Sequence, residues 1–496
     1  MVETQEKSDF FVDLDFYDEN LFGNEAGEDE DPEVLSSYFI TKEKFNKFLS
    51  PSRSFGIVRA RKGMGKSSLL SKLAFDVSKT DPNAIVISVT GADLLSFGHF
   101  EGRDHLKLQN EWKKSLSARI NHELGSKIGF AWTDDQMALV EASELVGYKG
   151  KNLIGSLLGR IKSKKIPIEV ITPTAKDPSV LLERYMAEKK DADIWLFVDD
   201  VDSTFSADEI QKARVSSFFS ACRALARDIK GLNIRASVRT DVWTTIRYNE
   251  DLDKCEQYAI DINWSRTELE KIISNKILSY LNRYHSNKIT KHWNVERAVD
   301  RERLISLVFM KRLRWSGSKV SPFTPIRILG AKRPRWMSQL CRLSAEAAAD
   351  REMKRAGIQD VNQILSDFGR LRVNDIYKEH SHQFGELQKL IETFSKGQKR
   401  YTTEQLLNKI QNGFVERVGV DGIGKIDSEN YIRPLQIAQL LYRIGFVLLR
   451  ETPNPGSPPS FVDFDERPEL LTDPSLDYTD CIWEVHPSYR GILGIS

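Results

Sequence analysis

The most constraining stretch of this sequence is a glycine-punctuated loop between an apolar run and an amphipathic segment. The apolar run contains Phe55, Ile57 and Val58, and residues 60–68 read Ala-Arg-Lys-Gly-Met-Gly-Lys-Ser-Ser. The loop follows the pattern G-x-x-x-x-G-K-[ST], except that Ala60 stands where the first glycine is expected. A strand before the loop and a helix after it favour a phosphate-binding loop over a glycine-rich turn that precedes a surface helix.

The residue types in this loop suit a bound nucleoside triphosphate. Glycines let backbone N–H groups curl around phosphate oxygens without Cβ clashes. We expect Lys66 to reach the β- and γ-phosphates and Ser67 to ligate Mg²⁺, while the helix N-terminus adds partial positive charge. The predicted nucleotide-binding residues of the loop are Arg61, Lys62, Gly63, Met64, Gly65, Lys66, Ser67 and Ser68.

The composition indicates a soluble globular protein with more than one domain. The chain of 496 residues is too long for one ordinary core, and 40% hydrophobic with 29% charged residues is typical of soluble proteins. A net charge of +1 provides no overall field that would attract nucleic acid. No apolar run approaches the ~18 residues of a membrane helix and no signal pattern opens the chain, so we expect a cytoplasmic protein without a membrane partner. The four scattered cysteines are predicted to be reduced, buried thiols.

A second strong signal is the apolar run 194–198, which is followed by Asp199 and Asp200. Such a run predicts a strand covered on both faces, and parallel sheets bind ligands at the carboxyl ends of their strands. We expect Asp199 to hold Mg²⁺ through water and Asp200 to orient or polarise the attacking water. The alternative is an acidic turn that caps a helix from Ser206, with Asp202 as a turn residue.

Three further short apolar runs are predicted to be strands of the same sheet. They cover residues 84–89, 232–238 and 258–262. The second of them ends in Ser237 and Arg239, and this arginine either senses the γ-phosphate or forms a surface ion pair with Asp241.

Two segments that flank or interrupt these strands have distinct compositions. The acidic N-terminal segment carries aromatic residues, and we expect the part from Phe16 to Phe22 to dock on the body of the protein. Residues 101–190 are predicted to be a mostly helical, lysine-rich insertion between strands.

Residues 265–354 are predicted to be entirely helical, and they contain a basic stretch at 311–335. Pro334 suits the first turn of a helix, and Gly330 suits the turn before it. Three interpretations of the basic stretch stay open: an arginine that leans over the nucleotide, a solvated face, or contacts with nucleic-acid phosphates.

The last 140 residues are predicted to form helices and then a two-stranded hairpin, which suggests a winged helix. The candidate recognition helix around 435–441 is apolar and the wing is acidic, so we favour a protein-interaction or packing role over DNA binding. His380 and His382 lack partners at ligand spacing, and we expect both to be exposed rather than metal ligands.

With both phosphate-binding signatures placed, the chain resembles the ASCE division of P-loop ATPases, near the AAA+ and STAND groups. It is especially similar to bacterial P-loop ATPases from phage-defence and conflict loci, in the style of the KAP ATPases. The matching segments are Phe22–Glu25 with Ala26 and Glu28, Ala60–Ser68, Val198–Asp202, Ser237–Arg239 with Asp241, Asn263–Ser265 with Leu269, Gly330–Arg335 and Glu484–Pro487.

The resemblance implies an α/β P-loop NTPase fold, with a parallel sheet in the order 5-1-4-3-2, a helical lid and a C-terminal winged-helix-like domain. It places Ser237 and Arg239 at the sensor-1 position and Arg333 at the lid (sensor-2) position, with Arg335 as the alternate. Asp200 stands where AAA+ proteins usually carry a catalytic glutamate, which leaves open slow, switch-like hydrolysis.

The function expected from these signals is an ATP-binding and ATP-hydrolysing switch subunit of an antiviral defence complex. It would couple its nucleotide state to homo-oligomerisation and to a protein effector, with nucleic acid as a less favoured partner. The predicted catalytic residues are Lys66, Asp199, Asp200 and Arg239, and the predicted Mg²⁺ ligands are Ser67 and Asp199. The alternative is a DNA-binding AAA+ ATPase that resembles an initiator or a loader.

We expect four parts along the chain. They are an acidic arm with a lead-in helix at 1–50, a P-loop core at 51–264 with an insertion at about 101–190, a helical lid at 265–356 and a winged-helix-like domain at 357–496.

Overall fold

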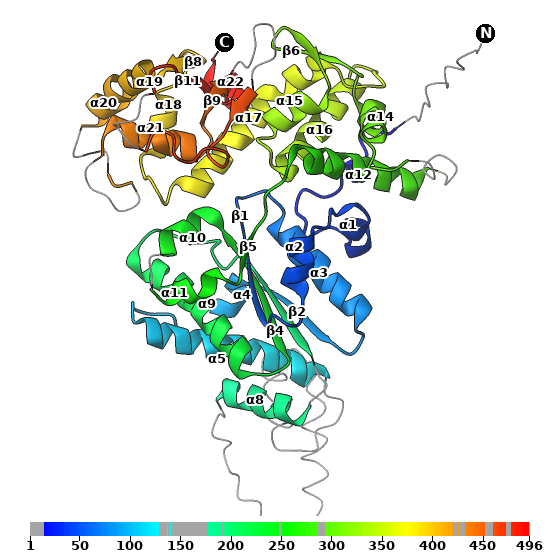
Figure 1. Cartoon of the computed structure of the whole chain (residues 1–496), viewed down its shortest axis with the longest axis vertical. Helices are drawn as coiled ribbons and strands as arrows, with labels where there is room; N and C mark the ends of the chain where they lie inside the picture. Colours follow the sequence, from blue (N-terminus) through cyan, green and yellow to red (C-terminus); the bar gives the residue numbers. More distant parts are fainter. Residues whose placement is uncertain are drawn as a thin grey trace, which may run out of the picture. The chain divides into compact units, whose positions relative to one another are not determined.

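A computed structural model of the chain (Figure 1) divides into two compact units. The sheet unit consists of Thr41–Arg61 and Lys66–Ile262, and the C-terminal unit consists of Met1–Ile40, Lys62–Gly65 and Asn263–Ser496. The structure describes residues 14–127, 136, 139, 177–189, 193–247, 250–285, 293–419, 422, 424–426, 432–451, 460–472 and 478–495.

The sheet unit is built on a parallel sheet of five strands in the order β2-β3-β4-β1-β5. The strands are β1 (Phe55–Ala60), β2 (Ile85–Thr90), β3 (Ile194–Asp199), β4 (Leu232–Arg239) and β5 (Ala259–Asp261). Read from its other edge, the order is 5-1-4-3-2, so the predicted sheet is confirmed. The residues of β3 and β4 are buried almost throughout, as expected for central strands covered on both faces.

Helices cover both faces of this sheet (Figure 1). Helix α3 (Lys66–Thr80) packs on one face, and α9 (Glu209–Asp228) and α10 (Thr240–Ile246) pack on the other. The shorter helices of the unit are α2 (Glu43–Leu49), α4 (Gly91–Leu95) and α11 (Glu250–Glu256). Helix α9 begins later than predicted because Asp208, not Ser206, is its N-cap and accepts the N–H groups of Ile210 and Gln211.

The described part of the predicted insertion at 101–190 contributes two helices to the sheet unit. Helix α5 (His105–Lys127) packs against α9, and α8 (Pro178–Glu188) packs against α5. Trp112 of α5 is buried and meets Phe218 of α9 edge to face, with the ring centroids 5.1 Å apart. The prediction for the residues between 128 and 176, except 136 and 139, lies outside the described residues.

The first core of the C-terminal unit gathers the N-terminal segment and the helices that follow the sheet unit. Phe16, Leu21 and Phe22 are buried in this core, which confirms the predicted docking of the acidic arm. The elements are η1 (Glu19–Leu21), α1 (Pro32–Tyr38), α12 (Arg266–Tyr284), α14 (Ala298–Val308), α15 (Phe323–Leu329) and α16 (Pro334–Ala349). Pro334 occupies the first turn of α16 and Gly330 lies in the turn before it, as predicted, and Gly330 is also the C-cap of α15.

The prediction that residues 265–354 are entirely helical is wrong. A two-stranded hairpin interrupts the helices, with β6 (Leu313–Trp315) and β7 (Ser318–Val320) joined by Ser316 and Gly317. Both turn residues have positive φ, +48° and +85°, as a two-residue turn that follows the twist of its strands requires. The Ser-Gly dipeptide is therefore the local signal that an interpretation based on helical periodicity overlooked.

The second core of the C-terminal unit is winged-helix-like, as predicted, but it contains a four-stranded sheet instead of the predicted two-stranded hairpin. An antiparallel sheet of four strands, in the order β10-β9-β11-β8, packs against helices that precede and interrupt it. The strands are β8 (Arg400–Thr402), β9 (Val447–Glu451), β10 (Ser460–Val462) and β11 (Ile482–Val485). The helices are α18 (Leu387–Glu392), α19 (Thr403–Ile410), η2 (Gln411–Val415), α20 (Glu416–Val418), α21 (Pro434–Arg443) and α22 (Pro487–Leu493).

Helix α21 is the predicted recognition helix, and its apolar residues belong to the core. Ile437, Leu440 and Leu441 are each buried among the strands and helices of this second core. The burial agrees with the packing role favoured from the sequence.

Helix α17 (Ile358–His380) belongs to both cores of the C-terminal unit. Val361 and Phe368 pack in the first core, whereas Val373 and Ile376 pack in the second. The expectation that His380 is exposed is wrong, since the residue ends α17 at 5% exposure with Nδ1 3.2 Å from Oε1 of Gln383.

Three structural facts bear on the expectations drawn from composition. Cys222, Cys255 and Cys341 are buried and form no disulfide, as predicted, whereas Cys481 is half-buried. In the described ranges, no helix is both long and apolar enough to span a membrane. Within the same ranges, no three or more His, Cys, Asp and Glu side chains are arranged to hold a metal ion by themselves.

Candidate nucleotide site

The predicted phosphate loop connects the end of β1 to the start of α3. Gly63 and Gly65 have φ values of +79° and +97°, in the left-handed region where a side chain adds strain. Ala60 is the last residue of β1 and does not have positive φ, so the position does not require glycine. Gly63 and Gly65 therefore stand at the two positions of the loop where the backbone conformation favours glycine.

Lys66 and Ser67 open helix α3 at the end of this loop. The Lys66 side chain is buried, and its Nζ donates to the carbonyl oxygen of Ala60 at 3.3 Å. The ammonium group is therefore folded back over the end of β1 instead of extending into solvent. Ser67 and Ser68 follow, half-buried, in the first turn of α3, where backbone N–H groups have no partner within the helix.

Asp199 ends β3, and the neighbouring strand β4 holds its carboxylate in place. The Ser237 hydroxyl donates to Oδ1 of Asp199. The Asp200 N–H donates to the same oxygen at 3.0 Å and to Oγ of Ser237 at 3.4 Å. Asp200 itself is exposed and has a φ of +52°, a conformation that Asp and Asn tolerate better than most residues. The structure thus brings Ser237 of β4 to the pair Asp199 and Asp200, which the sequence nominated at the end of a different strand.

Arg239, at the end of β4, is held by Asp202. The Asp202 carboxylate is 1% exposed and accepts the Arg239 N–H at 2.8 Å and its Nε at 3.3 Å. Asp241 adds a weaker ion pair at 3.7 Å and is itself 7% exposed. The predicted ion pair between Arg239 and Asp241 is therefore present, but both side chains are largely buried instead of lying at the surface. Asp202 is a buried partner of Arg239 as well as a turn residue.

These groups lie at one edge of the sheet because its strands are parallel. Strand β4 pairs with β1 on one side and with β3 on the other, so Ala60 pairs with Arg239 and Val198 with Ala236. With strands about 4.8 Å apart, the ends of β1 and β3 are about 10 Å apart across β4. Helix α3 begins at the same edge, which brings Lys66 and Ser67 toward the carboxylate of Asp199.

The residues at this edge fit Mg²⁺ together with a triphosphate. Mg²⁺ prefers oxygen ligands and usually takes only one or two from the protein, with water and phosphate oxygens completing its shell. The Ser67 hydroxyl and the Asp199 carboxylate are such ligands, and Lys66 is a cation for phosphate oxygens.

Residues Lys62–Gly65, the middle of the phosphate loop, belong to the C-terminal unit. Three of their carbonyl oxygens accept hydrogen bonds from that unit. Arg333 Nη1 donates to Lys62 at 3.1 Å, the Arg335 N–H donates to Gly63 at 3.3 Å, and Trp264 Nε1 donates to Met64 at 2.9 Å.

Lys62 is also held by two carboxylates on helix α17. Its N–H donates to Glu379 at 3.3 Å, and its Nζ forms an ion pair with Asp375 at 3.0 Å. Nothing in the sequence indicated these two residues, because they lie more than three hundred positions away and carry no motif of their own.

Arg333, which the resemblance places over the nucleotide, is 4% exposed and forms an ion pair with Glu379 at 2.7 Å. Its guanidinium also lies over the ring of Trp336, 4.2 Å from the ring centroid. Burial by itself lowers the pKa of the Arg333 guanidinium, because it disfavours the charged form. The nearby Glu379 carboxylate raises this pKa by more, so the net shift is upward.

Comparisons with known proteins reveal only distant likenesses. No family model matches the sequence. The chain is 22% identical, over 467 residues, to the "Putative transposon gamma-delta 80.3 kDa protein" of Escherichia coli (strain K12). The match covers 87% of this chain and 62% of that relative's length.

Among solved structures, the walker-type ATPase paby2304 of Pyrococcus abyssi is 10% identical with a TM-score of 0.39, covering 92% of this chain and 96% of that one. The Aeropyrum pernix ORC2 protein is 12% identical with a TM-score of 0.38, covering 93% and 91%. Domain III of the Thermotoga maritima replication initiation protein DnaA is 11% identical with a TM-score of 0.33, covering 68% and 98%. Likenesses this distant carry no argument about function, which rests on the residues of this chain.

Proposed function

We propose that this protein binds and hydrolyses ATP with Mg²⁺ and acts as a switch subunit. The observation that carries the proposal is the hydrogen bond from Ser237 to Asp199, at the sheet edge where Lys66 begins α3. A metal-binding carboxylate oriented by a hydroxyl, next to a glycine loop that ends in lysine and serine, is suited to phosphoryl transfer.

Each group at the edge has a defined task in the proposed reaction. Lys66 and the N–H groups of the loop bind the phosphate oxygens, and Ser67 and Asp199 would hold the metal. Mg²⁺, when bound, neutralises the charge that develops on the transferred phosphoryl group. Asp200 is exposed beyond the strand end, where its carboxylate can orient the attacking water. Arg239 supplies a positive charge at the end of β4.

The contacts of Lys62–Gly65 support a switch rather than an isolated hydrolase. Their carbonyl groups accept hydrogen bonds from residues 264, 333 and 335, so the middle of the loop is attached to the C-terminal unit. The chain continues directly from Gly65 to Lys66 and α3. A change in the loop on phosphate binding would therefore act on α16 and α17, which is the coupling that a switch needs.

The test of the proposal is ATP hydrolysis by the purified protein with Mg²⁺. Lys66→Ala and Asp200→Asn should each reduce the turnover by at least about 100-fold, because each removes a group that stabilises or positions the reacting atoms. Asparagine tolerates the left-handed backbone conformation at position 200 as aspartate does. The change in turnover therefore measures the loss of the carboxylate charge and not a change of the backbone. Lys79→Ala is the matched control, since Lys79 is exposed at the last turn of the same helix. Turnover at the unmodified level in both variants would end the proposal.

The wider setting that we propose is an antiviral defence complex, in which ATP controls self-assembly and a protein effector. The support is the sequence resemblance described above. Mass photometry with and without ATP tests the assembly: a shift to larger particles that Lys66→Ala abolishes is the expected result, and identical masses in all samples would contradict it.

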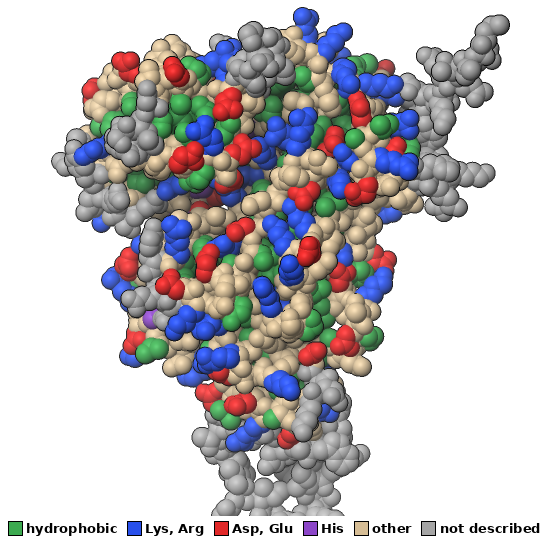
Figure 2. All heavy atoms as spheres, in the orientation of Figure 1, with side chains coloured by type: hydrophobic (Ala, Val, Ile, Leu, Met, Phe, Trp, Pro, Cys, Tyr) green, Lys and Arg blue, Asp and Glu red, His purple; other side chains and the backbone are tan. Residues whose placement is uncertain are grey.

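A DNA-binding, initiator-like ATPase is the second candidate function. Figure 2 shows Lys and Arg side chains gathered where Figure 1 labels β6, and Lys311, Arg312, Arg314 and Lys319 are exposed on or beside this hairpin. The acidic wing is also partly neutralised, because Lys332 forms ion pairs with Asp463 and Glu466 at 2.8 and 2.6 Å.

Duplex binding titrated with salt separates the two candidates. Steep loss of duplex affinity with salt, together with equal weakening by Arg312→Glu and Arg314→Glu, would favour the second candidate. Binding that is absent at about 0.05 M salt would exclude it.

A further inference from the structure

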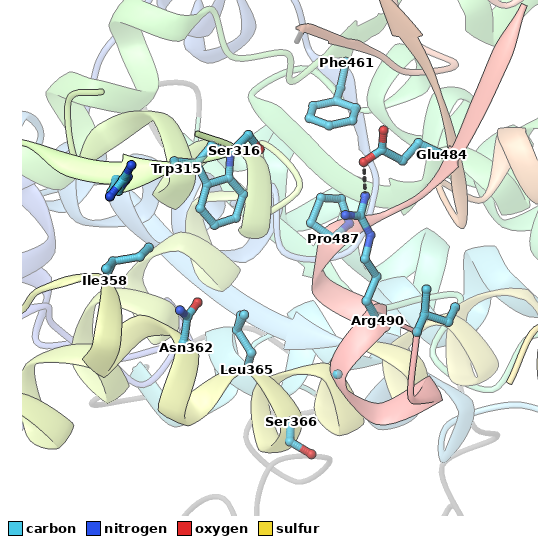
Figure 3. A pocket seen from close by; sticks show the side chains of 13 residues that line it. Trp315, Ser316, Ile358, Asn362, Leu365, Ser366, Phe461, Glu484, Pro487 and Arg490 are labelled. Carbon is cyan, nitrogen blue, oxygen red and sulfur yellow. Dashed lines mark hydrogen bonds and ion pairs between the residues drawn. The ribbon is translucent and has the colours of Figure 1, made fainter. Parts of the chain in front are cut away.

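The C-terminal unit contains a cavity of about 500 Å³ that is separate from the phosphate loop (Figure 3). It lies between the hairpin β6–β7, the first half of α17 and the elements β10, β11 and α22. Cavities of roughly 300–1,000 Å³ are the size class that holds small organic ligands. The residues that decide its chemistry are Arg314, Trp315, Asn362, Phe461, Glu484 and Arg490.

One wall of the cavity carries excess positive charge. Glu484 is buried, and its carboxylate is shared by three guanidinium groups, those of Arg400 and Arg450 at 3.0 Å each and that of Arg490. One negative charge cannot neutralise three positive ones, so this cluster attracts anions. Arg490 lines the cavity, and its side chain keeps 20% exposure despite the ion pair. The exposed Arg314 adds a further positive charge from the hairpin side.

Two aromatic side chains face the same space. Figure 3 shows the rings of Trp315 and Phe461 turned toward the cavity, with the Glu484–Arg490 pair beside Phe461. Both rings are only half-buried, although large aromatic side chains usually complete a core. Flat faces that remain accessible next to guanidinium groups are the combination that stacks nucleobases and binds phosphates.

We propose that this cavity binds a nucleoside phosphate unit. The base lies against Trp315 and Phe461, the phosphate lies on Arg314 and Arg490, and the exposed amide of Asn362 offers a donor and an acceptor to the base edge. The unit comes from a single-stranded nucleic acid or from a free nucleotide, which present the same chemistry to these side chains. An acidic peptide would use the two arginines but would leave the two rings without a flat partner.

The proposal goes beyond the ATP site and shares no residue with it. The cavity has neither a glycine-rich loop nor a serine and carboxylate pair arranged for Mg²⁺ among its lining residues. It therefore takes the base and a phosphate without the metal-bound triphosphate expected at Lys66.

The experiment uses the full chain with Lys66→Ala, so that the phosphate loop does not obscure the result. Binding of a fluorescent oligothymidylate and of AMP is measured in separate titrations. Trp315→Ala should lower the affinity for the probe at least about tenfold, because stacking on one aromatic ring contributes roughly 1–3 kcal/mol per base. Arg314→Glu should also lower the affinity for the probe, because it removes a positive charge beside the phosphate. Circular dichroism verifies that both variants remain folded.

Arg303→Glu is the control, because Arg303 is exposed on α14 and does not line the cavity. The proposal is supported if Arg314→Glu and Trp315→Ala weaken binding of the probe and Arg303→Glu leaves it unchanged. Oligothymidylate binding without AMP binding identifies a single strand as the source, and AMP binding without oligothymidylate binding identifies a free nucleotide. Absence of binding by both probes, or equal losses in the two arginine variants, overturns the proposal whatever the ATPase assay reports.

Discussion

The carboxylate of Glu379 lies 2.7 Å from Nη1 of Arg333, and both side chains are almost completely buried. Arg333 is the N-cap residue of α16 but makes no side-chain capping bond, because a guanidinium has no acceptor for the helix N–H groups. It donates to Glu379 of α17 instead. The Lys62 N–H donates to the same carboxyl group. One buried ion pair therefore ties α16 to α17 and holds a residue of the phosphate loop within the C-terminal unit.

Removing one partner of this pair should destabilise the C-terminal unit strongly. Arg333→Met leaves the Glu379 carboxylate buried without its cation, and such a loss costs about 3–5 kcal/mol. We expect a large shift of the urea unfolding midpoint, and substantial recovery in the double variant Arg333→Met with Glu379→Leu, since both charges are then gone. An unchanged midpoint in the single variant would contradict the prediction. ATP affinity in the stable double variant then reports whether Arg333 also contacts the nucleotide.

Ser237→Ala should reduce ATP turnover about tenfold without unfolding the sheet unit. The lost hydrogen bond goes to a charged carboxylate and contributes roughly 1.5 kcal/mol, which converts to about tenfold in rate. Steady-state kinetics at saturating ATP measure the effect. Ser217→Ala is the control, since Ser217 is equally buried and its hydroxyl bonds the Arg214 carbonyl within its own helix. Equal turnover losses in the two variants would argue against an orienting role for Ser237.

Asp202→Ala should destabilise the sheet unit by about 2–3 kcal/mol. Asp202 is buried and holds both the backbone and the side chain of Arg239. The Arg239 side chain is only 14% exposed, so water compensates little for the lost carboxylate. Chemical denaturation gives the free energy of unfolding. Asp228→Ala removes an exposed ion pair with Arg227 and should cost less than about 1 kcal/mol. A larger loss from Asp228→Ala than from Asp202→Ala would refute the assignment.

The C-terminal unit should lose stability in acid through His486. Burial, together with nearby Arg490 and Arg333, lowers the pKa of this histidine to about 3. The unfolded chain takes up the proton near pH 6.5 and the folded chain does not, so stability is lost as pH falls from about 6.5 to about 3. The slope approaches about 1.4 kcal/mol per pH unit for this one group.

His486→Asn provides the comparison for the acid prediction. His486 is the N-cap of α22 and accepts the Ser488 N–H at 3.2 Å, and asparagine can accept the same bond. Unfolding midpoints measured between pH 7 and pH 4 should fall less steeply for the variant than for the unmodified protein. Parallel pH profiles would show that His486 does not titrate on unfolding.

Local sequence patterns were sufficient to predict the strands of the parallel sheet and the loop that leads into α3. The run 194–198 is apolar without alternation, and only a strand covered on both faces buries such a run in full. Gly63 and Gly65 flank a methionine in a motif whose backbone needs positive φ, and both have it. The order of the strands followed from resemblance rather than from any pattern within the strands.

Other features were missed because their partners are distant in sequence. His380 was expected to be exposed because it lacks partners at metal-ligand spacing, but it is the last residue of α17 and is buried. Asp202 was predicted to be a turn residue only, because its partner Arg239 lies on a different strand, β4, far along the sequence. The hairpin at 313–320 was missed for a different reason. Its Ser-Gly turn is a local signal, but the helical patterns on both sides favoured a helical interpretation of the whole region.

The sequence alone determined the elements whose cause lies within a few residues: the buried strands, the glycine-dependent loop, and the serine, lysine and aspartates at the strand ends. Only the tertiary structure decided that Ser237 orients Asp199, that Glu379 holds Arg333, and that two aromatic rings and two arginines share one cavity. The reason is physical. Backbone conformation and burial patterns depend on bonded neighbours, whereas hydrogen bonds and ion pairs between distant residues exist only once packing has brought their helices and strands together.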